Sequence, residues 1–338
     1  MFVSFTATAT TYVLVYVDDI LITGSNSTAI SSLITTLNST FALKDLGKLH
    51  YFLGIEAHSL QTGGLHLTQS KYVSDLLKKA NMADAKPMPS PMISGQKLSS
   101  TDGSPFRDPV LYRSIVGALQ YATITRPDIS FSVNKVCQFM HNPLDTHWKT
   151  VKRILRYLSG TSSFGLHIKP SSNFHLSAFC DSDWGSDPND RKSTSGLCVF
   201  LGGNLISWSS KKQPVVSRSS TEAEYRCLAC TITELMWLRS LLSELRVSLL
   251  QVPTVYCDNL SVVLLTANPL FHSRTKHFEL DLHFVREKVV NKVVSVTHIP
   301  ATSQIADGLT KAISNTSFSE FRTKLRVSDS STTVLEGG

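Results

Sequence analysis

Two adjacent carboxylates interrupt an apolar stretch near the start of the chain. Asp18 and Asp19 follow Tyr16 and lie within the otherwise apolar residues 14–22. Paired acids in apolar surroundings are costly unless they bind a cation or are exposed at a turn. The pattern therefore allows two interpretations, a divalent metal clamp for phosphoryl transfer and an ordinary Asp-Asp turn.

Four further acids are spread over the second half of the chain. Asp181 and Asp258 each follow a short apolar run that is typical of a strand. Glu224 lies one turn into a long amphipathic segment, and Asp307 lies near the start of the last predicted helix. Carboxylates at strand ends and helix starts can converge on one edge of a sheet, where they would repel one another without divalent cations. Two Mg²⁺ ions roughly 4 Å apart, or Mn²⁺ in their place, could there activate water and stabilise the leaving oxygen of a phosphodiester.

These acids also have ordinary structural interpretations. Asp181 and Asp258 could be solvated strand-end residues, and Asp307 could be a first-turn acid favoured by the helix dipole. Asp183 competes with Asp181 because it lies only two residues further on. We favour Asp181, which directly follows the apolar strand, and regard Asp183 as an acid that could support the metal ligands.

The start of the long amphipathic segment offers two competing capping patterns. Thr221 and Glu224 have the Thr-x-x-Glu spacing of a capping box, and Ser219 and Glu222 have the same relation. If Ser219 caps the helix together with Glu222, the side chain of Glu224 is free to point into a site.

The elements that must position these acids follow from the spacing of apolar and turn-forming residues. Strands are expected at 174–180, 197–201, 205–209, 254–257 and 293–299, with hairpins through 11–22 and through 51–56 and 65–69. Helices are expected at 27–41, 70–80, 108–122, 128–140, 143–159 and 221–245, and from about residue 304. Segments 85–104 and 160–173 and the tail after 327 are rich in Gly, Pro, Ser or Thr and are expected to be loops. Three antiparallel strands followed by alternating helix and strand favour a mixed sheet with helices on both faces.

Length and composition bound the class of protein. The 338 residues suggest about two domains. The hydrophobic content of 42% suffices for real cores, and the charged content of 17% is too low for a disordered polyelectrolyte. A net charge of +7 fits a polyanionic partner. No segment has the length of a membrane span or the features of a secretory signal, so we expect an intracellular protein, cytoplasmic or nuclear and not secreted.

Six scattered cysteines give no zinc-binding pattern. Only Cys227 and Cys230 form a C-x-x-C pair, and no second pair completes a site of four ligands. We therefore expect reduced and mostly buried thiols.

Several strings resemble the Pol polyprotein of copia-type long-terminal-repeat retrotransposons. In the first half they are Tyr-Val-Asp-Asp with its apolar frame (16–24) and residues 41–47, 51–56, 112–121 and 125–129. In the second half they are residues 191–196, 207–213 and 219–225. The resemblance extends from about residue 11 to about residue 327.

The resemblance implies the fold and its division. The expected class is α/β (α+β), with an RNase H-like mixed five-stranded sheet and flanking helices, preceded by a partial reverse-transcriptase lobe of palm, thumb and connection. The expected parts are a partial reverse transcriptase (1–105), a helical connection region (106–170), an RNase H-like domain (171–327) and a flexible tail (328–338). Such a polymerase needs a third aspartate upstream of the hairpin, and the ten residues before Thr11 contain no acid. We therefore expect Tyr16, Asp18 and Asp19 to be a polymerase remnant without DNA synthesis.

For the second half, the resemblance implies RNase H chemistry. Asp181, Glu224, Asp258 and Asp307 match the order strand-Asp, helix-Glu, strand-Asp, helix-Asp and would hold two Mg²⁺ ions for cleavage of the RNA strand of an RNA–DNA hybrid. Some RNase H enzymes use a histidine near the position of His298 for proton transfer or product release, and a polar strand-end residue is the other interpretation. The expected phosphate contacts come from five basic residues around the predicted hairpin, Arg191, Lys192, Lys211, Lys212 and Arg218; the alternative is a solvated hairpin surface.

Two further expectations concern partners and the alternative function. Association with other retrotransposon proteins is expected, because protease and integrase motifs are absent from the sequence. The alternative to an enzyme is a non-catalytic nucleic-acid-binding relic of a retrotransposon polyprotein.

Overall fold

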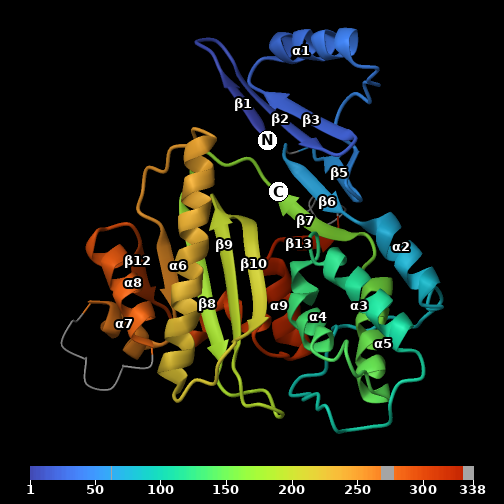
Figure 1. Cartoon of the computed structure of the whole chain (residues 1–338), viewed down its shortest axis with the longest axis vertical. Coiled ribbons are helices and arrows are strands. Elements are labelled where there is room, and N and C mark those ends of the chain that lie inside the picture. Colours follow the sequence, from blue (N-terminus) through green and yellow to red (C-terminus); the bar gives the residue numbers. More distant parts are fainter. Residues whose placement is uncertain (62, 268–277, 330–338) are drawn as a thin grey trace. The chain divides into compact units, whose positions relative to one another are not determined.

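The computed structural model describes residues 1–61, 63–267 and 278–329. The chain divides into two compact units, Met1–His58 and Ser59–Gly338, whose elements are labelled in Figure 1. This division falls inside the segment predicted as residues 1–105. The predicted boundaries at 105, 170 and 327 stay predictions, and residues 330–338 of the predicted tail lie outside the described residues.

The first unit is a small antiparallel sheet with one helix and a short second hairpin. Strands β1 (Phe2–Phe5), β2 (Thr10–Tyr16) and β3 (Asp19–Gly24) pair in that order, and α1 (Ser27–Thr40), β4 (Tyr51–Phe52) and β5 (Ile55–Ser59) follow. Asn26 caps α1 by accepting hydrogen bonds from the backbone N–H groups of Thr28 and Ala29. Within residues 1–58 only Thr11 and Ala57 are buried. The unit therefore has almost no core of its own.

The second unit contains the mixed five-stranded sheet that the sequence predicts. Its strands are β8 (Leu176–Asp183), β9 (Thr194–Leu201), β10 (Asn204–Lys212), β11 (Thr254–Cys257) and β12 (Ser295–His298), in the order β10-β9-β8-β11-β12. The first three in sequence are antiparallel neighbours, and β11 runs parallel to both β8 and β12. Gly202 and Gly203, both with positive φ, form the hairpin turn that joins β9 to β10.

Helices cover both faces of this sheet, as the sequence also predicts. On one face lies α6 (Ser220–Glu244), which runs along β8 and β9 in Figure 1, together with α7 (Leu260–Ala267) and α8 (Glu279–Val290). On the other face α4 (Ser130–Cys137) packs against β10, and α2 (Ser70–Lys79), α3 (Pro109–Ala122), α5 (Asp145–Ser159) and α9 (Asn315–Lys324) share the same hydrophobic core. One hydrophobic core therefore continues from the predicted connection helices to the back of the sheet. None of the helices in the described ranges combines the length and the apolar character that a membrane crossing requires.

Three sequence expectations about this unit are wrong. Residues 160–173, expected as a loop, contain β7 (Phe164–Ile168), which pairs with β6 (Leu65–Thr68) and β13 (Val327–Asp329). Residues 328 and 329, the first of the predicted flexible tail, belong to strand β13. The helix expected from about residue 304 is instead a 3-10 turn, Ile305–Leu309, and the helix proper begins at Asn315. Gly308 weakens helix formation, and Ser314 starts a new helix by accepting a hydrogen bond from the N–H of Ser317.

A buried ion pair fixes the junction between α3 and α5. Arg126 and Asp128 are 1% and 2% exposed, and Arg126 Nη2 lies 2.8 Å from Asp128 Oδ2. The hydroxyl of Tyr157 donates to the same carboxylate oxygen, and Arg126 Nη1 donates to the carbonyl of Thr161. Burial would lower the pKa of Arg126, but Asp128 and Tyr157 outweigh it and raise that pKa. The polar side chains of Thr125, Arg126 and Asp128 are thus buried in the core with hydrogen-bond partners.

Candidate metal centre

The four predicted acids converge at one edge of the five-stranded sheet. Carboxylate oxygens of Asp181, Asp258 and Asp307 all lie within 4.8 Å of one another. A second group at the same spacing joins Asp258 to Glu224 and the thiol of Cys257. Asp258 belongs to both groups, so the four acids form one connected cluster.

The strand register explains why two of these acids meet. Strands β8 and β11 are parallel neighbours, and Phe179 pairs with Tyr256. Asp181 and Asp258 each lie two residues beyond this pair and therefore emerge at the same edge of the sheet.

The cap of α6 decides between the two capping patterns. Ser219 accepts a hydrogen bond from the N–H of Glu222, and the Glu222 carboxylate accepts one from the N–H of Arg218 and pairs with Arg226. Glu222 is thereby committed to the helix start. Glu224, two residues on, points into the cluster, as the Ser219 alternative predicts.

A glycine brings the last acid close. Gly196 of β9 pairs with Asp181, and the turn that carries Asp307 packs against it. A Cβ atom at Gly196 would lie 2.7 Å from the side chain of Thr310 and 2.9 Å from the carbonyl oxygen of Ala306. Only glycine leaves room for this turn, and the turn supplies Asp307 to the cluster.

Glu224 has an unusual environment for a carboxyl group. Its residue is 7% exposed, and its Oε2 atom has no hydrogen-bond partner. Burial, and after it the charges of Asp181 and neighbouring groups including Asp258, raise the pKa of Glu224 to about 11. A divalent cation would supply both the missing partner and the opposite charge.

Asp181 and Asp307 each have a polar partner that sequence reasoning missed. The buried hydroxyl of Thr310 donates a 2.5 Å hydrogen bond to Asp181 Oδ2. The ammonium group of Lys311 lies 2.9 Å from Asp307 Oδ1. Burial and then Asp181 raise the pKa of Asp307 to about 6, against the opposing effect of Lys311. Thr310 and Lys311 lie three and four residues after Asp307 in the sequence, but nothing in this spacing indicated their contacts.

The other proposed participants lie around the cluster. Gln304, also missed from sequence, donates to the carbonyl of Cys180 at 2.9 Å and lies 3.4 Å from Asp258 Oδ1. His298 is exposed at the end of β12, and its Nε2 lies 3.2 Å from the backbone oxygen of Asp258. Asp183, the last residue of β8, is half-buried and is outside both close groups found in the described ranges.

The acidic pair of the first unit occupies a hairpin tip. Tyr16 pairs with Asp19, and the turn between them has a positive φ of 51° at Val17. Tyr16, Asp18 and Asp19 are all exposed. The predicted hairpin with the Asp pair at its tip is confirmed, and its role in a polymerase stays a prediction.

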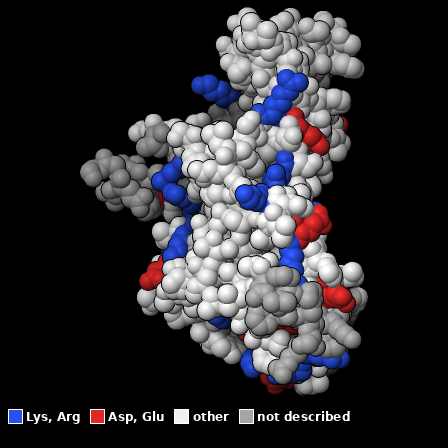
Figure 2. All heavy atoms as spheres, turned by 90° about the vertical axis from the view of Figure 1, so that its left-hand side faces the viewer, with Lys and Arg blue, Asp and Glu red and all other residues white. Residues whose placement is uncertain are grey.

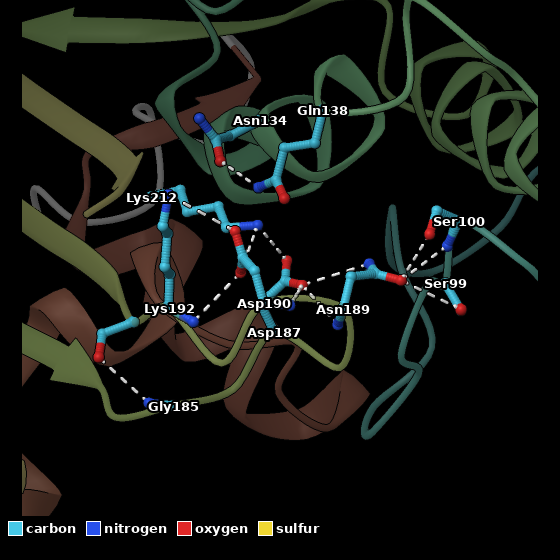
Figure 3. A network of polar contacts seen from close by, with 11 residues as sticks. Ser99, Ser100, Asn134, Gln138, Gly185, Asp187, Asn189, Asp190, Lys192 and Lys212 are labelled. Atoms are coloured by element: carbon cyan, nitrogen blue, oxygen red, sulfur yellow. Dashed lines mark hydrogen bonds and ion pairs between the residues drawn. The ribbon is translucent and has the colours of Figure 1, made fainter. Parts of the chain in front are cut away.

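Among the predicted nucleic-acid-binding residues, Lys192 and Lys212 form ion pairs with acids of the same loop region (Figure 3). Lys212 Nζ lies 2.8 Å from Asp187 Oδ2 and 2.9 Å from Asp190 Oδ1, and Lys192 lies 3.7 Å from Asp190. The other three, Arg191, Lys211 and Arg218, are exposed. On the face in Figure 2, Lys and Arg are interspersed with Asp and Glu among many uncharged residues. The net charge of +7 is therefore not gathered into a continuous patch on that face.

The same network attaches the predicted linker to the loop between β8 and β9. Asn189 Oδ1 accepts hydrogen bonds from the backbone N–H and hydroxyl of Ser100 and from the hydroxyl of Ser99 (Figure 3). Asp187 in turn accepts from the backbone N–H of Asn189. The segment 85–104 is therefore held in place near residues 99 and 100.

All six cysteines are free, as the sequence predicts. Cys180, Cys198, Cys227 and Cys257 are buried, whereas Cys230 is exposed. The two members of the C-x-x-C pair thus differ in exposure.

The chain is similar to several known proteins. The family model described as reverse transcriptase (RNA-dependent DNA polymerase) matches residues 1–94. The chain is 50% identical over 316 residues to the Pol polyprotein from transposon RE1 of Arabidopsis thaliana, covering 94% of this chain and 22% of that protein. It is 54% identical over 227 residues to an uncharacterized mitochondrial protein of the same plant, covering 67% of this chain and 93% of the relative. Against the Pol polyprotein from transposon TNT 1-94 of Nicotiana tabacum, the identity is 38%, covering 90% of this chain and 23% of the relative.

Two solved structures are also similar. LC11-RNase H1, isolated from compost, is 15% identical, with coverage of 40% of this chain and 93% of that chain and a TM-score of 0.33. The foamy viral protease-reverse transcriptase in complex with RNA/DNA hybrid is 15% identical, with coverage of 86% of this chain and 36% of that chain and a TM-score of 0.47. The chain spans about a fifth of the length of the Pol polyproteins that it matches.

Proposed function

The chain belongs to the copia-type retrotransposon Pol polyproteins, and from this premise we propose that residues 171–327 are a ribonuclease H domain. Its reaction is divalent-cation-dependent hydrolysis of the RNA strand of an RNA–DNA hybrid, which leaves a 3′-hydroxyl. The observation that carries the proposal is the convergence of Asp181, Glu224, Asp258 and Asp307 from four separate elements onto one sheet edge.

The donor set fits Mg²⁺. Hard divalent cations prefer carboxylate oxygens, and the cluster offers four acids together with the unpartnered Oε2 of Glu224. Asp181, Glu224, Asp258 and Asp307 would hold the ions, and Mn²⁺ would be able to replace Mg²⁺. When bound, such ions supply an activated water and neutralise charge at the leaving oxygen.

The remaining residues orient the ligands and manage charge. Thr310 holds Asp181 in one orientation through its hydroxyl, and Lys311 balances the charge of Asp307. Gln304 ties the carbonyl of Cys180 to the side chain of Asp258. We assign His298, exposed beside Asp258, to proton transfer or product release.

The hybrid would be bound mainly through phosphates. Arg191, Lys211 and Arg218 are exposed and suit phosphate contacts. Lys192 and Lys212 instead form ion pairs with Asp187 and Asp190, and we assign them a structural role. We propose for Tyr16, Asp18 and Asp19 the active-site hairpin of a reverse transcriptase, supported by the family match over residues 1–94. Association with other retrotransposon proteins also remains a proposal.

Cleavage of a hybrid by the purified full chain tests the proposal. A labelled RNA strand annealed to DNA is incubated with Mg²⁺ or Mn²⁺, and wild type is compared with Asp181→Asn and with the control variant Asp75→Asn. Asp181→Asn should abolish cleavage, whereas Asp75→Asn, an exposed acid on α2, should retain it. Equal activity of wild type and Asp181→Asn would falsify the assignment.

Two further readouts separate the alternatives. Hybrid binding with a steep salt dependence but without cleavage would favour the non-catalytic relic. Primer extension on the same hybrid, with wild type and Asp18→Asn compared, tests whether the hairpin of Asp18 and Asp19 takes part in DNA synthesis.

A further inference from the structure

We propose that Glu224, Cys257 and Asp258 form a site for a thiophilic divalent cation of the Zn²⁺ class, in which a thiol joins two carboxylates of the acidic cluster. One ligand atom from each of the three lies within 4.8 Å of the other two. Glu224 comes from the second turn of α6, Cys257 ends β11, and Asp258 directly follows it. The start of α6 and the end of β11 therefore place a thiol against two carboxylates.

The ligand chemistry selects a softer ion than Mg²⁺. Thiolates favour Zn²⁺ and related ions, whereas Mg²⁺ takes oxygen ligands. Three protein ligands and a water complete a tetrahedral zinc site with ligand spacings of about 3.3 to 3.5 Å. The observed spacing of up to 4.8 Å needs only a modest closure of the three side chains.

A second observation points to a missing ligand. Glu224 is more than nine-tenths buried, and its Oε2 atom has no partner. The thiol of Cys257 is fully buried, and its hydrogen bond to the carbonyl of Asn259 is long, at 3.9 Å. Binding of the ion would convert the thiol to a thiolate, and the released proton would pass to solvent.

Two more thiols lie next to the site. Hydrogen bonds with Cys227 and Cys257, and then burial, raise the pKa of Cys180 well above its ordinary value. The Sγ atom of Cys227 lies 3.4 Å from the carbonyl oxygen of Gly196. Neither thiol belongs to the close groups in the described ranges, so Cys257 is the ligand that the geometry assigns.

The thiophilic site shares Asp258 with the all-oxygen group, and Glu224 is also among the proposed Mg²⁺ ligands. An ion bound to Glu224, Cys257 and Asp258 therefore competes with the proposed Mg²⁺ site for two carboxylates, and each ion weakens the binding of the other. Inhibition of hybrid cleavage by Zn²⁺ rests on the proposed function, whereas binding of the ion does not.

Cadmium binding to the reduced, metal-free full chain tests the site directly. Cd²⁺ is titrated while the ultraviolet thiolate-to-metal charge-transfer band and the heat of binding are recorded. We expect one equivalent to bind with the band, and Cys257→Ala to lose the band and to weaken binding by about 10-fold or more. Cys198→Ala, a buried thiol on the opposite face of the sheet, is the matched control and should bind as wild type does.

Further variants keep the test decisive if Cys257→Ala folds poorly. Cys257→Ser preserves the size of the side chain and should also lose the band, while Glu224→Gln should weaken Cd²⁺ binding with every thiol intact. An unchanged band in both Cys257 variants, or a band lost only in Cys180→Ala or Cys230→Ser, would overturn the proposal.

The activity readout separates this proposal from the previous one. Zn²⁺ inhibition of hybrid cleavage, measured against each protein's own rate with Mg²⁺, should be at least about 10-fold weaker in Cys257→Ser than in wild type. If Cd²⁺ binds but the chain cleaves no hybrid, the proposed ribonuclease function is wrong and the thiophilic site is supported. If the chain cleaves the hybrid but Cd²⁺ binding does not depend on the Cys257 thiolate, the thiophilic site is wrong and the ribonuclease function is supported.

Discussion

The hydroxyl of Thr310 donates a 2.5 Å hydrogen bond to Oδ2 of Asp181, a residue 129 positions earlier in the chain. Thr310 is completely buried, and Asp181 is 6% exposed. The contact links the 3-10 turn that carries Asp307 to the strand that carries Asp181. It therefore fixes the relative positions of two acids of the cluster.

Thr310→Val should weaken the proposed cation site without removing a ligand. Valine keeps the shape of the side chain but leaves Asp181 without its donor. We expect the Mg²⁺ affinity or the cleavage rate to fall by about 10- to 100-fold. A Mg²⁺ titration of hybrid cleavage measures this effect. Thr310→Ser keeps the hydroxyl donor and should therefore retain the wild-type Mg²⁺ affinity and cleavage rate. Wild-type behaviour of Thr310→Val would show that the hydrogen bond does not position Asp181.

Protonation of His147 should destabilise the second unit at mildly acidic pH. His147 Nδ1 accepts from the N–H of Leu144, and its Nε2 lies 2.9 Å from the carbonyl of Ser99, so the neutral ring fits both partners. Burial lowers the pKa of His147 below its ordinary value of 6.5. The unfolded chain therefore binds the proton first, and stability falls as pH drops through about 6.5 toward the folded pKa.

The measurement is the free energy of unfolding between about pH 7.5 and about pH 5.5. His147→Gln should show a smaller loss of stability over this range than wild type. The His147→Gln variant should still lose some stability as the pH falls, because burial also lowers the pKa of His167. The exposed His141→Gln serves as the control, and a pH dependence equal in both variants would contradict the prediction.

The buried Arg126–Asp128 pair should be costly to break. Arg126→Met leaves the Asp128 carboxylate buried without its cation, which should cost about 3 to 5 kcal/mol. Tyr157→Phe removes one donor to that carboxylate and should cost about 1 to 3 kcal/mol. Urea unfolding measures both, and Arg113→Met, on the exposed face of α3, should change stability by less than about 0.5 kcal/mol. A similar loss in Arg126→Met and Arg113→Met would refute the role of the pair.

Neighbouring lysines on β10 should have different roles. Lys211 is exposed, so Lys211→Gln should leave stability unchanged. It should reduce the slope of the logarithm of the hybrid-binding constant against the logarithm of the salt concentration by about 1, the loss of one phosphate contact. Lys212→Gln should instead lower stability by about 1 to 3 kcal/mol, because Asp187, with a 3% exposed side chain, loses its cation. Salt-titrated hybrid binding and thermal unfolding of both variants distinguish the roles. The interpretation fails if Lys212→Gln retains wild-type stability.

The sequence by itself identified the family, a mixed sheet with helices on both faces and the four candidate acids. These features depend on local information, such as the period of apolar residues along β8 and α6, the Gly202-Gly203 turn and the composition around each acid. The two competing capping patterns at the start of α6 could be stated from sequence, but the hydrogen bonds of Ser219 and Glu222 decided between them.

Only the tertiary structure showed what surrounds the acids. The contact of Thr310 with Asp181, the 3-10 turn at Asp307 and the clearance at Gly196 depend on how residues 305–310 pack against β8 and β9. The thiol of Cys257 joins Glu224 for the same reason, because its position depends on the pairing of β8 with β11. Such contacts join residues far apart in the chain, and no local pattern of residues encodes them.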